Sequence, residues 1–290
     1  MPFDANLDTT QSQWLSTESN YQNQHGVFYG HVAGGTAFLL CGIIWMLKYS
    51  FSSIVQQQAV PPNNAIFHIQ KLPIEGLYWF FAGSLALIQI FSNSSFTLNL
   101  MTEEGDFIPN NLHEWQHVSL SAPFLLYGCT KIMAETKYPA LIGLADPMGI
   151  IACGIFGLVM LLHTYAMDPV NAQIHYLLSA TSFCTTVSFV TDYALPNNRI
   201  PFIIVRAFFM LLQGTWMVQA AFVLEPPNDD VTWDLNDEVT VMFISTVYVW
   251  HALCDMAFLA LLNCVVQTSL RQLRKSPFVN YKVLSSTDDE

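Results

Sequence analysis

Seven apolar stretches, each long enough to cross a lipid bilayer as a helix, constrain this chain more than any other feature. They cover residues 30–50, 74–95, 115–135, 139–163, 174–194, 201–224 and 239–266. Crossing the hydrocarbon core takes about 20 apolar residues in a helix. Lipid cannot hydrogen-bond a bare backbone, and the alternating pattern of a barrel strand is missing from these stretches. The sequence therefore predicts an all-α membrane protein, a bundle of seven transmembrane helices.

The sequence predicts three parts of the chain: a polar, acidic tail (1–29), the seven-helix domain (30–266) and a second tail (267–290). Charged residues make up 11% of the chain, whereas soluble domains contain about 25%. The first 29 residues hold no Lys or Arg and no early apolar core, unlike a cleavable signal peptide. We expect the first span to serve as the insertion signal.

The cations predict the orientation in the membrane. All 10 Lys and Arg residues lie at one end of the predicted spans, after or near the ends of the odd-numbered ones, with Arg206 just inside the sixth. The positive-inside rule makes this end cytosolic, so we predict a lumenal or extracellular N-terminus and a cytosolic C-terminus. The net charge of −12 then belongs to the outer face. It argues against a nucleic-acid partner and attracts cations.

Histidines recur where the spans meet the outer face. His31 opens the first span, His117 the third and His175 the fifth, while His163 closes the fourth, so all four share one depth. His251 lies deeper, within the seventh span. Imidazole suits zinc, copper, iron and nickel, and a tetrahedral zinc ion takes three or four protein ligands. These five residues form a candidate metal site.

A different role also explains four of these histidines. A ring at the headgroup level keeps one edge in water, and a polar side chain at a helix end caps free backbone groups. Anchoring and capping therefore stay open as an alternative. The deep position of His251 favours a buried hydrogen bond or a functional role instead.

Three buried charged residues are expected to interact near the cytosolic end. A carboxylate in lipid is costly unless it is paired or protonated. We therefore expect Arg206 to contact Asp255 or Asp146, as a structural ion pair rather than a proton relay.

Several known protein functions are excluded because the sequence lacks the residue or motif that each one requires. The seventh span has no Lys for a retinal Schiff base, and the chain contains no Walker, dinucleotide or GxSxG pattern. No nucleophile stands out, so the sequence leaves open whether the protein is an enzyme.

Five segments carry a family resemblance: "GHVAGGTAFLLCGIIWMLKYS", "EWQHVSL", "LLHTYAMDPVNAQIHYLL", "LLQGTWMVQAAFVLEPP" and "WDLNDEVTVMFISTVYVWH". They resemble, in order from about residue 30 to 266, the transmembrane protein 45 family, which is built around domain of unknown function 716. The resemblance implies a multi-span protein in which the shared histidines correspond to His31, His117, His163, His175 and His251. His113 does not belong to the family pattern, so we expect it to lie outside the cluster.

The loops and tails contain two candidate motifs, one for sorting and one for glycosylation. Tyr281 and Leu284 in "YKVL" fit the Tyr-x-x-apolar motif that clathrin adaptors bind as an added strand. Asn93 matches a glycosylation sequon close to the end of the second span. The expected location is the plasma membrane or the Golgi, endosomes or lysosomes.

Three function classes follow. The first is a metal-dependent membrane protein, such as a hydrolase that acts on lipid with a metal-activated water. The second is a non-enzymatic scaffold or trafficking protein whose polar groups only fix helix packing. The third is electron transfer through a haem held by two histidines.

Overall fold

The computed structural model describes residues 28–51, 72–92, 96–165, 167–195, 199–227 and 233–275. These residues form seven α-helices: Phe28–Phe51, called the first helix, then α3 (Ile74–Phe91), α4 (Pro109–Thr136), α5 (Ile142–His163), α6 (Pro169–Ala194), α7 (Arg199–Leu224) and α8 (Glu238–Lys275). A 3-10 turn, η1 (Pro139–Leu141), precedes α5. Each predicted span coincides with one helix, so the all-α membrane fold is confirmed.

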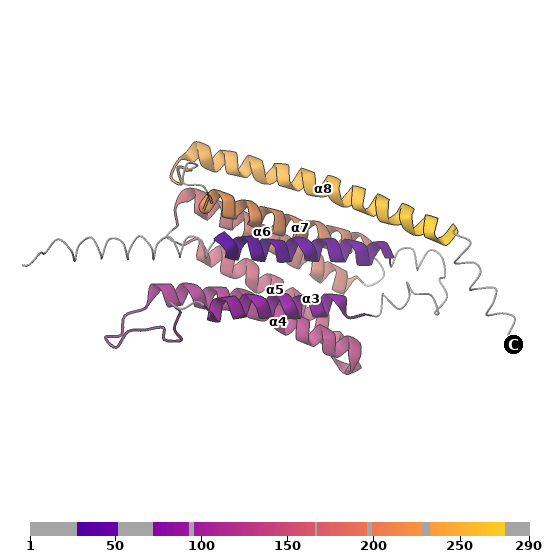
Figure 1. Ribbon diagram of the computed structural model, residues 1–290, viewed down its shortest axis with the longest axis horizontal. Coiled ribbons are helices and arrows are strands. Elements are labelled where there is room, and N and C mark those ends of the chain that lie inside the picture. The colour runs from indigo at the N-terminus through magenta and orange to yellow at the C-terminus, as the bar shows by residue number, and fades with distance from the viewer. Residues whose placement is uncertain are drawn as a thin grey trace, which may run out of the picture.

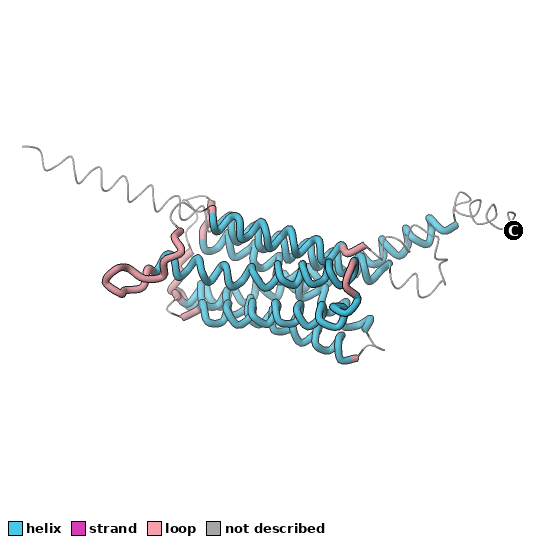
Figure 2. Tube along the Cα trace, turned by 90° about the horizontal axis from the view of Figure 1, so that it is seen from below, coloured by secondary structure: helices cyan, strands magenta, loops and turns pink. Residues whose placement is uncertain are grey.

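The helices lie side by side along one long axis (Figures 1 and 2). Each helix from α3 to α7 packs against the next one in sequence, and α8 packs on α6 and α7. The first helix fits between α3 and α7. Tyr78 of α3 donates a hydrogen bond to the carbonyl of Ala37, and Gly214 of α7 faces the backbone of Leu39.

Helix α6 is covered by its neighbours and is polar for a membrane helix. Five of the seven helices are long and apolar enough to count as candidate spans within the described residues, and α4 and α6 are not among them. Two buried hydroxyls of α6 donate to backbone carbonyls of α5: Ser179 to Gly157 at 2.7 Å and Ser182 to Cys153 at 2.8 Å. Such small hydroxyl residues allow close helix contact in membranes.

An aromatic cluster fills the middle of the bundle. The rings of Trp79 and Phe124 stack with centroids 4.5 Å apart, and Phe38 lies edge-on to Phe156 at 4.9 Å. These side chains come from the first helix, α3, α4 and α5. They separate the histidine end of the bundle, which holds His31, His163 and His175, from the opposite cationic end.

The cationic end is organised around a buried carboxylate. Glu75 of α3 accepts hydrogen bonds from the Trp45 indole at 2.8 Å and the Tyr127 hydroxyl at 2.5 Å. Lys48 lies 3.4 Å and Lys131 4.0 Å from its second oxygen. The buried carboxylate of Glu75 thus links three helices, the first helix, α3 and α4.

The prediction that Arg206 contacts Asp255 or Asp146 is wrong. Its guanidinium pairs at 3.4 Å with Asp192, at the end of α6, and lies over the rings of Trp45 and Phe189 at 4.3 and 4.0 Å. The short link between α6 and α7 brings Asp192 to the depth of Arg206, and α6 packs directly on α7.

The two carboxylates predicted as partners bind elsewhere. Asp146 forms a 3.1 Å ion pair with Lys131 of α4, its neighbour in the bundle. Asp255 accepts a 2.7 Å hydrogen bond from the hydroxyl of Thr215. Asp146 thus faces α4 rather than α7. Asp255 does face α7, but it contacts Thr215 rather than Arg206.

The orientation and three motif residues remain predictions. Asn93, Tyr281 and Leu284 lie outside the described residues. A tag at the N-terminus is expected to be accessible from the lumen or the outside, and a tag after Glu290 only from the cytosol, because the positive-inside rule makes the end that the sequence predicts to be rich in Lys and Arg cytosolic. Antibody labelling of selectively permeabilised cells measures this. Detection of both tags from one side would contradict seven crossings.

Candidate metal centre

Four helices contribute histidines to one end of the bundle. Helix α4 begins at Pro109, a residue suited to the first helical position. His113 and His117 therefore lie one turn apart on the same face. His163 is the last residue of α5, His175 lies in the second turn of α6, and His31 lies at the start of the first helix.

The five imidazoles form a continuous chain across the bundle. Ring centroids are 4.4 Å apart for His113 and His117, 5.3 Å for His113 and His163, and 5.3 Å for His163 and His175. His31 lies 6.2 Å from His175, and His117 lies 6.4 Å from His163. Side chains distant in sequence thus meet at one place.

The structure brings together four of the predicted ligands, His31, His117, His163 and His175, and adds a fifth. The expectation that His113 lies outside the cluster is wrong. Helix α4 starts at Pro109, ahead of the predicted span at 115, so His113 is helical and faces α5 with His117. The sequence contained a usable signal in the four-residue spacing of the pair.

His251 lies apart from this chain. Among the described residues, the ring it contacts outside its own helix is that of Trp216 on α7, with centroids 5.8 Å apart. The indole of Trp216 in turn donates to the carbonyl of Ile174, the residue before His175. His251 therefore belongs to the contact between α7 and α8.

Hydrogen bonds at Nδ1 orient three of the rings. The His163 Nδ1 lies 2.7 Å from the side-chain oxygen of Gln116, and the His175 Nδ1 lies 2.9 Å from the backbone oxygen of Asn171. The His117 Nδ1 lies 3.3 Å from Glu114 Oε2. Because each partner is an acceptor, Nδ1 carries the proton and Nε2 keeps a lone pair for a ligand. Metal-bound histidines are held in this way.

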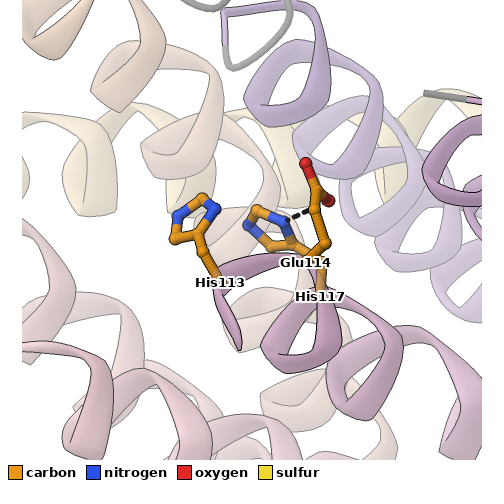
Figure 3. Close-up of side chains that lie close together, drawn as sticks. All are labelled: His113, Glu114 and His117. Atoms are coloured by element: carbon orange, nitrogen blue, oxygen red, sulfur yellow. Dashed lines mark hydrogen bonds and ion pairs between the residues drawn. The ribbon is translucent and has the colours of Figure 1, made fainter. Parts of the chain in front are cut away.

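The tightest group of ligand atoms comes from α4 (Figure 3). One atom each from His113, Glu114 and His117 lie within 4.8 Å of one another. Ligands of one tetrahedral zinc ion, with bonds of about 2.0 Å, lie about 3.3 Å apart. Small side-chain rotations would close the difference. The side chains of His117 and Glu114 are 34% and 21% exposed, so an ion can reach them.

An acidic loop lies beside this group. The loop between α3 and α4 extends beyond the helix ends (Figures 1 and 2) and turns at Gly105, whose φ is 91°. Asn111 ties the loop to α4 through hydrogen bonds to Thr97 and Asn99. The exposed acids of the turn are Glu103, Glu104 and Asp106. Hydrogen bonds from its own backbone and from Thr102 lower the pKa of Glu104, so its charge persists and attracts cations.

Glu114 and Gln116 are the site residues that sequence reasoning missed. Both lie within "HEWQHVSL", the segment that carries the histidine pair. The role of Gln116 depends on the lateral contact between α4 and α5, which depth in the membrane does not specify. Glu114 could have been found from the sequence, because residues 113–117, HEWQH, match the His-Glu-x-x-His pattern of zinc-binding helices.

Comparison with known proteins agrees with this architecture. Residues 143–264 match the Family of unknown function (DUF716). The chain is 24% identical over 247 residues to transmembrane epididymal protein 1A of Mus musculus, covering 79% of this chain and 77% of that protein. Transmembrane epididymal protein 1 of Rattus norvegicus is 23% identical over 241 residues, with the same coverage. The Homo sapiens protein of that name is 27% identical over 149 residues, or 50% of this chain and 54% of that protein. The family match includes His163, His175 and His251.

Proposed function

We propose that this chain, whose residues 143–264 match the DUF716 family and which resembles proteins named as transmembrane proteins, is a multi-pass membrane protein that binds a divalent transition metal ion. The site is the histidine end of the bundle, and zinc fits its ligands best. The ligand set combines neutral imidazoles with one carboxylate, and this set suits zinc better than magnesium or calcium, which prefer oxygen.

The convergence of five imidazoles carries this proposal. Histidines that only anchored helix ends would have no reason to approach one another. Here His163 is within 5.3 Å, centroid to centroid, of both His113 and His175. His175 is 4% exposed and thus points into the bundle rather than toward headgroups. Three Nδ1 atoms are also bonded to acceptors, which leaves the lone pair of Nε2 free to bind a ligand.

His113, His117 and Glu114 are the proposed first ligands, and His163 is the next nearest imidazole. Three protein ligands leave one position of a tetrahedral zinc ion open to water. Zinc would lower the pKa of such a water, and the resulting hydroxide could attack an ester or amide bond. The partial exposure of His117 and Glu114 would admit a lipid headgroup. Hydrolysis of lipid is therefore the specific activity that we propose for this site.

Metal analysis of the detergent-purified protein tests the proposal. We expect zinc to co-purify and cobalt to bind with the absorption spectrum of a tetrahedral site. His113→Ala and His163→Ala should each weaken binding roughly tenfold or more, as loss of a supporting residue already does. His251→Ala is the matched control and should bind like the wild type, because its ring lies against Trp216.

The other outcomes separate the alternatives. Protein without bound metal, with unchanged cobalt titrations in both variants, would favour a scaffold. A haem Soret band that disappears with the histidine substitutions would favour electron transfer. Zinc-dependent cleavage of a fluorescent phospholipid or ceramide in micelles would support the hydrolase, whereas bound zinc without cleavage would restrict the proposal to metal binding.

A further inference from the structure

Helix α8 is attached to the bundle by a series of polar contacts. It lies along one side of the bundle (Figure 1), with most of its apolar side chains exposed to the membrane. Three side-chain hydrogen bonds link it to α6 and α7: Gln173 to Ser245 at 3.0 Å, Thr181 to Tyr248 at 2.7 Å, and Thr215 to Asp255 at 2.7 Å. These contacts begin at the histidine end and reach the middle of the predicted span 239–266.

The participating residues of α8 form one stripe. Ser245, Tyr248, His251 and Asp255 are spaced by three or four residues and therefore share one face of the helix. The rings of Tyr248 and His251 both lie against Trp216, with centroids 5.2 and 5.8 Å away. Successive groups are about 5 Å apart along the axis, a separation that one water molecule bridges.

Asp255 is an acid without a cationic partner. It is 6% exposed, and its hydrogen bond comes from a neutral hydroxyl, that of Thr215. Within the described residues, no Lys, Arg or His forms an ion pair with it. Arg206, the cation of α7, lies about 13 Å further along that helix and is paired with Asp192. An unpaired carboxylate is costly in hydrocarbon, so the neutral, protonated acid is the form that fits this site.

We propose that the stripe from Ser245 to Asp255 is a proton path from the histidine end to a proton-binding site within the membrane. His251 accepts a proton on one ring nitrogen and releases a proton from the other. The carboxylate of Asp255 accepts that proton and becomes the neutral acid. Only protons move, and no other bond is made or broken. Cys184 of α6 is a further titratable side chain close to Tyr248, and Cys254 precedes Asp255 on α8.

The path is closed toward the cationic end in this conformation. Beyond Asp255 comes the buried Leu259, and the next polar residue on this side of α8, Asn263, bonds the hydroxyl of Ser50 at 3.0 Å. Gln267 reaches the backbone oxygen of Ser50 at 3.3 Å. Release of the proton on that side requires these contacts to open. The proposed activity is therefore gated proton translocation, and it does not depend on a bound metal.

Proteoliposomes with an internal pH dye test this activity. A potassium gradient with valinomycin sets the membrane potential, and its sign decides whether protons enter or leave the vesicles. Wild-type protein should change the internal pH at least about tenfold faster than it changes in protein-free vesicles. Asp255→Asn keeps the size of the side chain and its bond to Thr215 but does not titrate, and His251→Phe keeps the contact with Trp216. Both should reduce the flux to background. Cys254→Ala, at the exposed neighbouring position, is the matched control and should retain it.

Two further measurements make the result decisive. Infrared spectra should show a protonated-carboxyl band that is missing in Asp255→Asn and present in Asp255→Glu. Asn263→Ala should raise the flux by weakening the contact with Ser50. Wild-type flux equal to that of empty vesicles, or full flux in folded Asp255→Asn, would overturn the proposal.

Discussion

Replacing Glu75 by leucine is expected to lower the free energy of unfolding by about 3–5 kcal/mol, the cost of removing one partner from a buried charge pair. Glu75 is 4% exposed and joins three helices. Without it, the Trp45 indole and the Tyr127 hydroxyl lose the carboxylate oxygen that accepts their hydrogen bonds, at 2.8 and 2.5 Å. Lys131, whose side chain is 12% exposed, loses one of its carboxylates and keeps Asp146 and Glu135.

Unfolding in mixed micelles, followed by circular dichroism, measures this loss. Glu75→Gln should fall between wild type and Glu75→Leu, because its amide oxygen still accepts from Trp45 and Tyr127 while the negative charge is gone. Glu103→Gln, in the exposed loop, is the control for removal of a carboxylate and should change stability by less than about 0.5 kcal/mol. Equal stability of Glu75→Leu and wild type would show that the Glu75 network contributes little to holding the three helices together.

Depth in the membrane was predictable from the sequence, and lateral position was not. Each span requires an apolar run, so the helices and the level of His31, His163 and His175 follow from counting along the chain. The partner of a side chain depends on which helix lies beside it. Asp146 was expected beside Arg206 for this reason, but it faces α4, whereas Asp192 lies on the helix next to Arg206. Asp255 does face α7 and differs from the expectation in depth, because it contacts Thr215 instead.

Helix starts were the second limit of prediction. The predicted third span began at 115 because the residues before it are polar, yet α4 begins at Pro109. The start is fixed by local features, the proline itself and the contacts of Asn111 with the preceding loop. A hydropathy pattern does not contain this information. The family pattern had placed His113 outside the cluster, and this early helix start explains why its ring lies 4.4 Å from that of His117 instead.

Replacing Gly214 by leucine is expected to cost about 3 kcal/mol or more, the upper range for overpacking a tight contact. A Cβ at this position would lie 2.2 Å from the backbone nitrogen of Leu39 and 2.6 Å from the carbonyl oxygen of Gly35. These neighbours are backbone atoms of the first helix, so no side-chain rotation relieves the clash. Small residues at such crossings are what allow membrane helices to approach closely.

The same substitution at Gly143 provides the matched control. Gly143 is also helical and exposed, and a Cβ there meets nothing within 4 Å. Gly143→Leu should therefore unfold like the wild type, and Gly214→Ala should lose part of the stability that Gly214→Leu loses. The first helix carries His31 and packs on α7 through this crossing. Gly214→Leu should therefore also expose Cys41, a buried residue of the first helix, to a thiol reagent. Unchanged unfolding and labelling would mean that the first helix does not depend on close contact with α7.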